Sequence, residues 1–255
     1  MASQAPPRIF SRQRRIVGLR RARVRQAHRD AARYILDDMV EDVLDRLEFM
    51  RLAPNRVLVI GDWTGTLALS LRGAGSEVEE RDVATLDEEQ PVPGAPYDLI
   101  VSLASLDRVN DLPGALLHLR NALGDDGMLI ASIVGAGSLP HLRRAMLAAE
   151  PDRPAARMHP LVDNQAASAL LQRALFKRQV VDSRSLTVSF GTLERLVSDL
   201  RDQGLGGTLA SAPPPLGKAA LERAEQAFRK AANDLSPIHI LPCRCSTLCP
   251  TRCPS

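Results

Sequence analysis

Two stretches of this sequence have the residue types and order of a ligand-binding strand–loop–helix unit. In the first, an acid opens the apolar run 97–102, and a polar loop leads to a helix start at 110–113. A polar turn containing glycine joins that helix to a second apolar run ending at Ile130. In the second, the apolar run 57–60 passes through the glycine loop 61–65 into a helix. Loops of this kind hold ligands in α/β proteins, so small-molecule binding is the first chemistry we expect.

The cysteines at the carboxyl end offer a second kind of chemistry. They are Cys243, Cys245, Cys249 and Cys253. Four thiolates at short spacing can close a zinc site or hold an iron–sulfur cluster. The pattern C-x-C-x3-C-x3-C matches neither zinc ribbons nor ferredoxin runs. Prolines at 242, 250 and 254 and the lack of an apolar pattern favour a disordered tail. We therefore predict a Cys- and Pro-rich tail over 236–255 and no metal.

Other catalytic signatures are scarce. The five histidines are scattered and none has the spacing of a metal site; they are His28, His118, His141, His159 and His239. His159 precedes Pro160, where a role at a helix entry is favoured over catalysis. Neither a Gly-x-Ser-x-Gly elbow nor a Walker A loop is present, which weakens hydrolase and NTPase interpretations. The catalytic residues are therefore left unassigned.

Composition and charge are those of one α/β core with appendages. The chain has 255 residues, of which 45% are hydrophobic and 25% charged. A formal net charge of +3, from 33 basic and 30 acidic residues, is too balanced for a nucleic-acid binder. No apolar run approaches about eighteen residues, so no membrane span is expected. Without a secretory apolar region, a cytoplasmic protein is the favoured interpretation.

The first thirty residues are unusually rich in arginine. Nine arginines precede or flank the first acid, Asp30; they are Arg8, Arg12, Arg14, Arg15, Arg20, Arg21, Arg23, Arg25 and Arg29. Such a segment is typical of a mitochondrial transit peptide, or of a basic arm that docks on an acidic partner or a membrane surface. Because 1–25 shows no apolar period, we predict a flexible basic arm over 1–28.

The elements that must position the candidate residues follow from periodicity. Apolar residues at helical spacing from Ile35 to Met50 predict an amphipathic helix before the first strand. The charged stretch 77–83 is a weak second strand. Later elements are expected as helices at 139–150 and 164–176, strands at 179–182 and 185–190, and helices at 192–204 and 218–233. One domain over 29–235 is therefore predicted between the arm and the tail.

Three segments carry a resemblance to a known family. They are Ile9-Phe10-Ser11-Arg12, the segment 98–131, which contains Ser105-Leu106-Asp107-Arg108-Val109-Asn110-Asp111-Leu112-Pro113, and 138–160. The chain resembles class I S-adenosylmethionine-dependent methyltransferases, closest to the group that includes mitochondrial complex I assembly factor 5 and its bacterial relatives. Malonyl-carrier-protein methyltransferases are more distant. The resemblance covers most of 8–232 and implies a Rossmann-like α/β fold. It excludes the Cys tail, where the family has its final strands.

The resemblance also implies where S-adenosylmethionine binds. The implied cofactor-binding residues are Gly61, Asp62, Trp63, Gly65, Asp82, Ser102 and Leu103. In the family, strand one carries an acid and the loop a central glycine; here those positions hold Val59 and Trp63. The Trp63 ring either stacks on a ligand or fills the pocket, and filling is slightly favoured.

Acids are the other part of the implied cofactor site. Asp82 is placed to bind the ribose hydroxyls, or else is a solvated charge on an edge strand. Contact with the adenine amino group would fall to Asp87, Glu88 or Glu89. The family's His-Trp pair is replaced by Asp107-Arg108, which removes a candidate base or forms an internal salt bridge.

The sheet is expected to be trimmed. Only fifteen residues separate Asp82 from Asp98, and they include Pro91, Pro93 and Pro96. A standard methyltransferase sheet has a helix and a strand in this interval, for which there is little room. We expect the helix to be lost or reduced to one turn.

Two functions follow from the sequence. The first is a methyltransferase with a divergent cofactor loop and an unknown small-molecule or protein substrate. The second is a non-methylating assembly factor of the respiratory complex I type that holds an acidic protein through its arginine arm. The expected compartment is the bacterial cytoplasm, or the mitochondrial matrix if the protein is eukaryotic.

Overall fold

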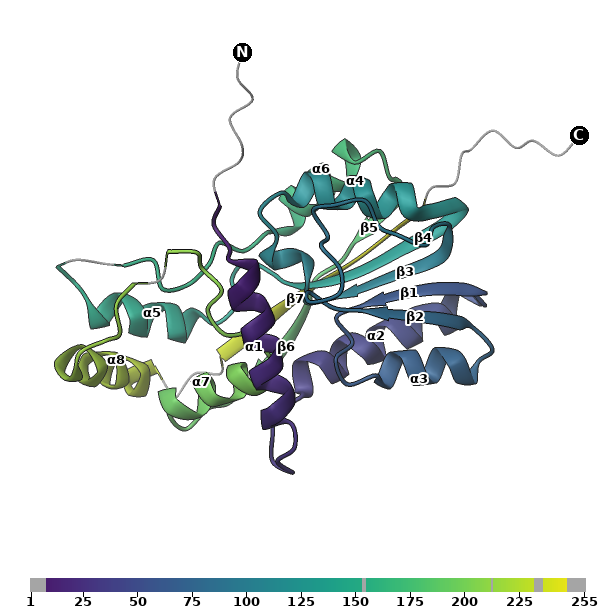
Figure 1. Ribbon diagram of the computed structural model, residues 1–255. Coiled ribbons are helices and arrows are strands. Elements are labelled where there is room, and N and C mark those ends of the chain that lie inside the picture. The colour runs from purple at the N-terminus through teal and green to yellow at the C-terminus, as the bar shows by residue number, and fades with distance from the viewer. Residues whose placement is uncertain (1–7, 153–154, 212, 232–235, 247–255) are drawn as a thin grey trace, which may run out of the picture.

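A mixed β-sheet forms the centre of the molecule (Figure 1). The computed structural model describes residues 8–152, 155–211, 213–231 and 236–246. Within these residues the sheet has seven strands in the order β2-β1-β3-β4-β7-β5, with β6 also paired to β7. The strands are β1 (Arg56–Ile60), β2 (Glu77–Arg81), β3 (Tyr97–Leu103), β4 (Leu123–Val134), β5 (Lys177–Val181), β6 (Arg184–Val188) and β7 (Ser236–Ser246). Strands β1 to β4 run parallel, and β7 is antiparallel to β4, β5 and β6.

Helices cover both faces of the sheet. They are α1 (Arg12–Arg25), α2 (Tyr34–Met50), α3 (Thr66–Gly73), the short η1 (Leu106–Arg108), α4 (Leu112–Ala122), α5 (Pro140–Ala149), α6 (Asn164–Arg173), α7 (Leu193–Asp202) and α8 (Lys218–Ala231). Helices α2 and α3 lie on one face and α4 and α6 on the other (Figure 1). This arrangement is the predicted Rossmann-like α/β fold.

Strand β1 shows why its sequence is a continuous apolar run and does not alternate between apolar and polar residues. Val57 and Val59 belong to the core that α2 and α3 cover, together with residues of α5, α7 and α8. Leu58 and Ile60 belong to the opposite core, under α4 and α6. Every second side chain therefore faces a different core, as in parallel strands that are buried on both sides.

Side-chain caps fix the helices that flank the binding loops. Asp111 accepts a hydrogen bond from the backbone N–H of Gly114 at 2.9 Å, which starts α4 where the sequence predicted. Asp163 and Thr192 cap α6 and α7 in the same way. The predicted polar turn at 124–127 lies within β4 as an irregularity, because the register passes from Tyr97 opposite Leu123 to Leu99 opposite Met128.

The sheet is trimmed as expected. Residues 82–96 form only turns and extended segments, with no helix or strand, so β2 is the edge strand on this side. Prolines in this interval prevent helix formation and cannot donate to a strand ladder. In the part of the chain that the structure describes, no helix has both the length and the apolar character to cross a membrane.

The prediction of a flexible arm was wrong for 12–25, which form helix α1. Ser11 caps the helix by accepting from the N–H of Arg14. The helix lies across the carboxyl edge of the sheet rather than on a face of it (Figure 1). Only Arg15 and Ala22 of the helix are buried. The sequence showed no apolar period because ion pairs, rather than an apolar stripe, hold most of this helix in place.

The prediction of a disordered tail was wrong for 236–246, which form strand β7. This strand pairs with β4 from Met128 opposite Ser246 to Val134 opposite Ile240. Cys245 is buried in the core under α4 and α6, and Cys243 packs against the same core. Prolines lack the N–H group that a central strand needs, so Pro242 made the segment look unlike a strand. Cys249 and Cys253 lie outside the described residues.

Candidate functional site

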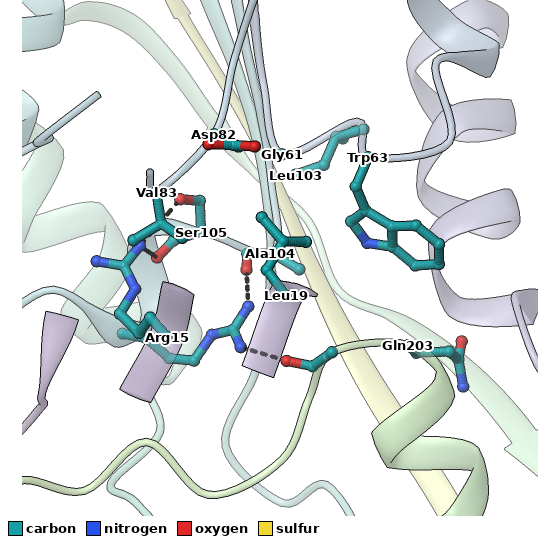
Figure 2. A pocket seen from close by; sticks show the side chains of 12 residues that line it. Arg15, Leu19, Gly61, Trp63, Asp82, Val83, Leu103, Ala104, Ser105 and Gln203 are labelled. Carbon is teal, nitrogen blue, oxygen red and sulfur yellow. Dashed lines mark hydrogen bonds between the residues drawn. The ribbon is translucent and has the colours of Figure 1, made fainter. Parts of the chain in front are cut away.

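A small cavity lies at the carboxyl ends of β1, β2 and β3, where the sequence placed the cofactor. Four of the seven predicted residues line it, namely Gly61, Trp63, Asp82 and Leu103 (Figure 2). The other three, Asp62, Gly65 and Ser102, do not line it. The remaining wall includes Arg108, which the sequence had indicated. It also includes residues that the sequence did not indicate as cofactor contacts, among them Arg15 and Leu19 of α1 and Gln203 and Gly204 after α7.

Gly61 is required by the fold at this point. Its φ is +88°, a conformation that side-chain-bearing residues rarely adopt. A Cβ atom at this position would overlap the backbone carbonyl oxygen of Leu103 at the end of β3. The first glycine of the loop therefore permits the close approach of β1 and β3, independently of any ligand.

Asp62 holds the loop that follows β1. One carboxylate oxygen accepts from the N–H of Gly65 at 3.1 Å and from the Thr64 hydroxyl at 3.0 Å. The other accepts from the N–H of Ala68 at 3.0 Å, in the first turn of α3. Because both oxygens are engaged, Asp62 acts as a cap for α3 in this structure. Gly65, with a φ of +74°, makes the turn into that helix.

Asp82 is placed at the end of β2 as the sequence predicted, but its oxygens already have partners. One accepts from the N–H groups of Ala84 at 2.8 Å and Thr85 at 3.1 Å. The other accepts from Arg23 of α1 at 2.8 Å. Partial burial raises the pKa of Asp82, and the Ala84 N–H and the Arg23 charge outweigh it and hold the pKa below its ordinary value. Asp82 is therefore ionised at neutral pH.

Helix α1 closes the cavity over these residues. The Arg15 guanidinium donates to both carboxylate oxygens of Glu88, at 2.8 and 3.4 Å, and to the backbone oxygen of Ser105 at 3.2 Å. The Ser105 hydroxyl also bonds to Glu88. Arg15 and Glu88 are 7% and 1% exposed, so this is a buried ion pair. Leu19, one turn later on the same helix, lines the cavity beside it (Figure 2).

The space that α1 leaves does not fit S-adenosylmethionine. The cavity volume is about 50 Å³. Small-molecule pockets typically measure about 300–1,000 Å³. A group of that size therefore enters only if α1 moves away from the sheet edge.

The three acids proposed for the adenine amino group already have partners within the protein. Glu88 pairs with Arg15, and Glu89 accepts from the N–H of Asn110 at 2.6 Å. Asp87 lies 3.8 Å from Arg12. The indole of Trp63 lies across the cavity from Arg15, and it is half-buried against the core under α2 (Figure 2). Both stacking and filling are therefore open to it.

Ser102 lies near the end of β3, and Asp107 and Arg108 follow it in η1. Ser102 is fully buried, and its hydroxyl has no hydrogen-bond partner among the described residues. Arg108 donates to the backbone oxygens of Gly204, at 2.7 Å, and Ala104. Its Nε lies 3.7 Å from Asp107, which is the internal salt bridge weighed from the sequence. Arg108 thus ties the end of β3 to the loop after α7.

The cysteines give no support to a metal centre in the described part of the chain. There, no group of three or more His, Cys, Asp and Glu side chains is placed to hold a metal ion. Burial raises the pKa of the Cys243 thiol to about 11. Because metals bind the thiolate, a thiol of this kind is a poor ligand at neutral pH.

Known proteins that resemble this chain in sequence include methyltransferases and an arginine hydroxylase. A model of the methyltransferase domain matches residues 27–178. Arginine-hydroxylase NDUFAF5, mitochondrial, of Rattus norvegicus is 33% identical over 133 residues, which are 49% of this chain and 39% of that protein. The match thus spans about two fifths of that relative. A malonyl-[acyl-carrier protein] O-methyltransferase of Halorhodospira halophila is 28% identical over 220 residues, covering 76% of this chain and 73% of that protein.

A solved structure gives the same fold. The [4+2]-cyclase SpnF superposes with a TM-score of 0.52 at 13% identity, over 96% of this chain and 99% of that one. Such low identity shows the fold alone. With the domain model matching more than half of the chain, and with the strand order and glycine loop described above, this chain belongs to the methyltransferase-domain family of S-adenosylmethionine-dependent, methyltransferase-like proteins.

Proposed function

We propose that this protein is a methyltransferase that takes up S-adenosylmethionine only when α1 lifts from the sheet edge. The observation that carries this is the convergence of Gly61, Asp82 and Leu103 at the carboxyl ends of three parallel strands. Ligands in open α/β sheets bind at this edge. Asp82, ionised and freed from Arg23, offers an acceptor to the ribose hydroxyls.

The contacts of α1 are compatible with such a movement. Apart from the buried Arg15–Glu88 pair, the helix has ion pairs from Arg12 to Asp87, Arg23 to Asp82 and Arg25 to Asp202. The Arg23 and Arg25 side chains are 48% and 39% exposed, whereas Asp82 and Asp202 are 12% and 8% exposed. These two pairs are therefore only partly buried and hold the helix less firmly than the Arg15–Glu88 pair. Ala22 is the one fully buried apolar residue of this helix, and Ile16, Val17 and Leu19 are partly buried, so the apolar surface that holds it is limited.

Isothermal titration with S-adenosylmethionine tests this proposal. Arg23→Ala removes the competitor for Asp82 and loosens α1, so it should bind the cofactor more tightly than the unaltered chain. Adding Asp82→Ala to that variant should weaken binding at least tenfold relative to Arg23→Ala alone. Asp126→Ala, an exposed acid at the start of β4, is the matched control and should change nothing. No heat of binding at millimolar cofactor for either the unaltered chain or Arg23→Ala contradicts the proposal.

A second candidate function, the partner-binding assembly factor of the complex I type, is favoured by one surface. An open groove of about 1,000 Å³ lies between α1 and the loop after α7. Its arginines are Arg14, Arg20, Arg21, Arg25 and Arg201, with Val17 and Val24 between them. This arginine groove fits an acidic peptide with apolar residues, because opposite charge steers association. For either function the proposed compartment is the bacterial cytoplasm, or the mitochondrial matrix if the protein is eukaryotic.

Peptide binding distinguishes this candidate. A fluorescent Asp- and Glu-rich peptide should bind the unaltered chain with an affinity that falls as salt rises. The double variant Arg20→Ala/Arg21→Ala should lose most of the binding, whereas Arg173→Ala, on α6, should keep it. Equal binding by both variants would rule out the arginine groove as the docking surface.

A further inference from the structure

A second cavity lies next to the first and is lined mainly by apolar side chains. Its volume is about 250 Å³, and its walls come from α5, α7 and the segment 157–161. Leu142 and Met146 contribute from α5, and Leu200 contributes from α7. An apolar cavity of about 150 Å³ is large enough to bind benzene. This second cavity therefore has room for a single substituted ring.

Two polar side chains in this cavity lack the hydrogen bonds that burial demands. Asp107 is 6% exposed, and neither carboxylate oxygen has a hydrogen-bond partner among the described residues. The Nε2 atom of His159 is in the same state and lies 3.9 Å from Asp107 Oδ2. At 3.7 Å, Arg108 Nε is also too far from Asp107 to form a hydrogen bond. Unsatisfied buried polar groups are rare in native proteins and call for an explanation.

The spacing of these groups suits an inserted polar atom. One oxygen can lie about 2.8 Å from both Asp107 Oδ2 and His159 Nε2, because the two atoms are 3.9 Å apart. Burial lowers the pKa of His159, whereas the Asp107 charge raises it and the Arg108 and Arg143 charges lower it further. The net result is a pKa below the ordinary value for histidine. The neutral imidazole can then donate or accept at Nε2. Its ring is held edge-on by Phe10, with centroids 5.6 Å apart.

We propose that the second cavity binds an apolar molecule of about one ring whose hydroxyl group lies between Asp107 and His159. The hydroxyl donates to Asp107 Oδ2 and accepts from His159 Nε2–H, so that each of these two buried atoms gains a hydrogen-bond partner. The apolar walls bury the ring, and Arg157 and Arg201 stand among the lining residues.

The position of this cavity suggests what the bound molecule is for. Asp107 lines the second cavity, and Arg108 lines the first. In the loop after α7, Gly204 lines the first cavity and Leu205 lines the second. The two cavities are therefore adjacent along the chain at both places. The bound hydroxyl compound is therefore assigned as the methyl acceptor: its oxygen would form the bond to the methyl carbon as the sulfonium–methyl bond breaks, and its proton would pass to Asp107. This assignment rests on the proposed function, whereas the binding of the compound does not.

Titration without cofactor tests the site. The probes are 4-methylphenol and toluene, which differ by the one hydroxyl. The unaltered chain should bind 4-methylphenol about tenfold more tightly than toluene, because the hydroxyl bonds to a buried charge. In Asp107→Leu and in His159→Phe that preference should fall to about one, with toluene binding retained. Circular dichroism verifies that each variant is folded.

A variant with a larger side chain in the second cavity tests whether the probes bind there. Leu142→Trp should abolish binding of both probes, and Met146→Trp serves in its place if that variant does not fold. Equal affinity of the two probes for the unaltered chain, or binding that survives a filled cavity, overturns the proposal. If 4-methylphenol binds as expected but S-adenosylmethionine does not, the site stands and only its assignment to the acceptor fails.

Discussion

At the scale of single residues, the polar groups around the first cavity satisfy one another. Asp82 is held by Arg23, Glu88 by Arg15, and Asp62 by the loop that it caps. Each acid is therefore part of the fold as well as a candidate ligand contact. Mutations here test both roles, so a stability measurement must accompany every binding measurement.

Gly61→Ala should strongly destabilise the protein. The new Cβ meets the Leu103 carbonyl, and the residue keeps a φ of +88°. Strain of this kind costs about 1–3 kcal/mol for the backbone alone, and the steric overlap adds to it. Urea denaturation measures the change.

The control for this prediction is Gly73→Ala at the end of α3. A Cβ there meets nothing within 4 Å, and Ala is the better helix former by up to about 1 kcal/mol. This variant should be neutral or slightly stabilised. A neutral Gly61→Ala would mean that β1 and β3 do not approach as closely as described.

The thiol of Cys243 should react slowly in the native protein. Burial raises its pKa from 9.0 to about 11, so it remains a thiol at neutral pH. The double variant Cys249→Ser/Cys253→Ser leaves only Cys243 and Cys245. A thiol reagent should modify this variant at pH 8 far more slowly than it does after unfolding in guanidinium.

The same shift gives a pH dependence. Above pH 9 the unfolded chain loses the Cys243 proton while the folded chain retains it until about pH 11. The contribution of this group to stability is thus complete below pH 9 and falls as pH rises to about 11. Cys243→Ala should reduce that fall. Rapid modification at pH 8 without denaturant contradicts the placement of Cys243 in β7, where it is partly buried against the core.

At the scale of elements, helix α1 is held by one buried ion pair and by more exposed ion pairs that contribute less. The pair Arg15–Glu88 is buried, whereas Arg12 and Asp87 are 43% and 40% exposed at 3.8 Å. Removing one partner of a buried pair leaves an uncompensated charge, while an exposed pair contributes little. Arg15 is therefore the residue on which docking of the helix depends.

Arg15→Ala should cost about 3–5 kcal/mol of docking free energy, because Glu88 stays behind without its partner. Amide hydrogen exchange in α1 should accelerate accordingly. Arg12→Ala should cost less than about 1 kcal/mol and leave the exchange rates nearly unchanged. Similar exchange in the two variants would show that the buried pair does not hold the helix.

At the scale of the whole molecule, β7 joins two parts of the sheet. It pairs with β4 on one side and with β5 and β6 on the other. Neither β5 nor β6 has another partner strand among the described residues. The last described strand of the chain thus completes the sheet.

A chain that ends at residue 235 should not fold cooperatively. Its β4 would expose an unpaired edge, and β5 and β6 would lose their ladder. A chain that ends at Ser246 retains all of the β7 pairings and should melt like the full chain. Thermal unfolding followed by circular dichroism compares the two, and equal cooperativity would disprove the pairing.

The sequence by itself determined the elements whose signals are local. The apolar run of β1, the cap at Asp111 and the proline-rich interval after Asp82 each specify structure within a few residues. The same local order predicted the Rossmann-like fold. It also brought Gly61, Trp63, Asp82 and Leu103 to one edge, because consecutive parallel strands end on the same side.

Only the tertiary structure decided how that edge is closed. Arg23 and Asp82 are 59 residues apart in sequence, and Arg15 and Glu88 are 73 apart. An arginine-rich segment has the same local pattern whether its charges face solvent or meet distant acids. Likewise, β7 becomes a strand because the edge of β4 is available to it, despite prolines that oppose that conformation locally. Docking of α1, pairing of β7 and the meeting of Asp107 with His159 depend on non-local contacts, which periodicity does not encode.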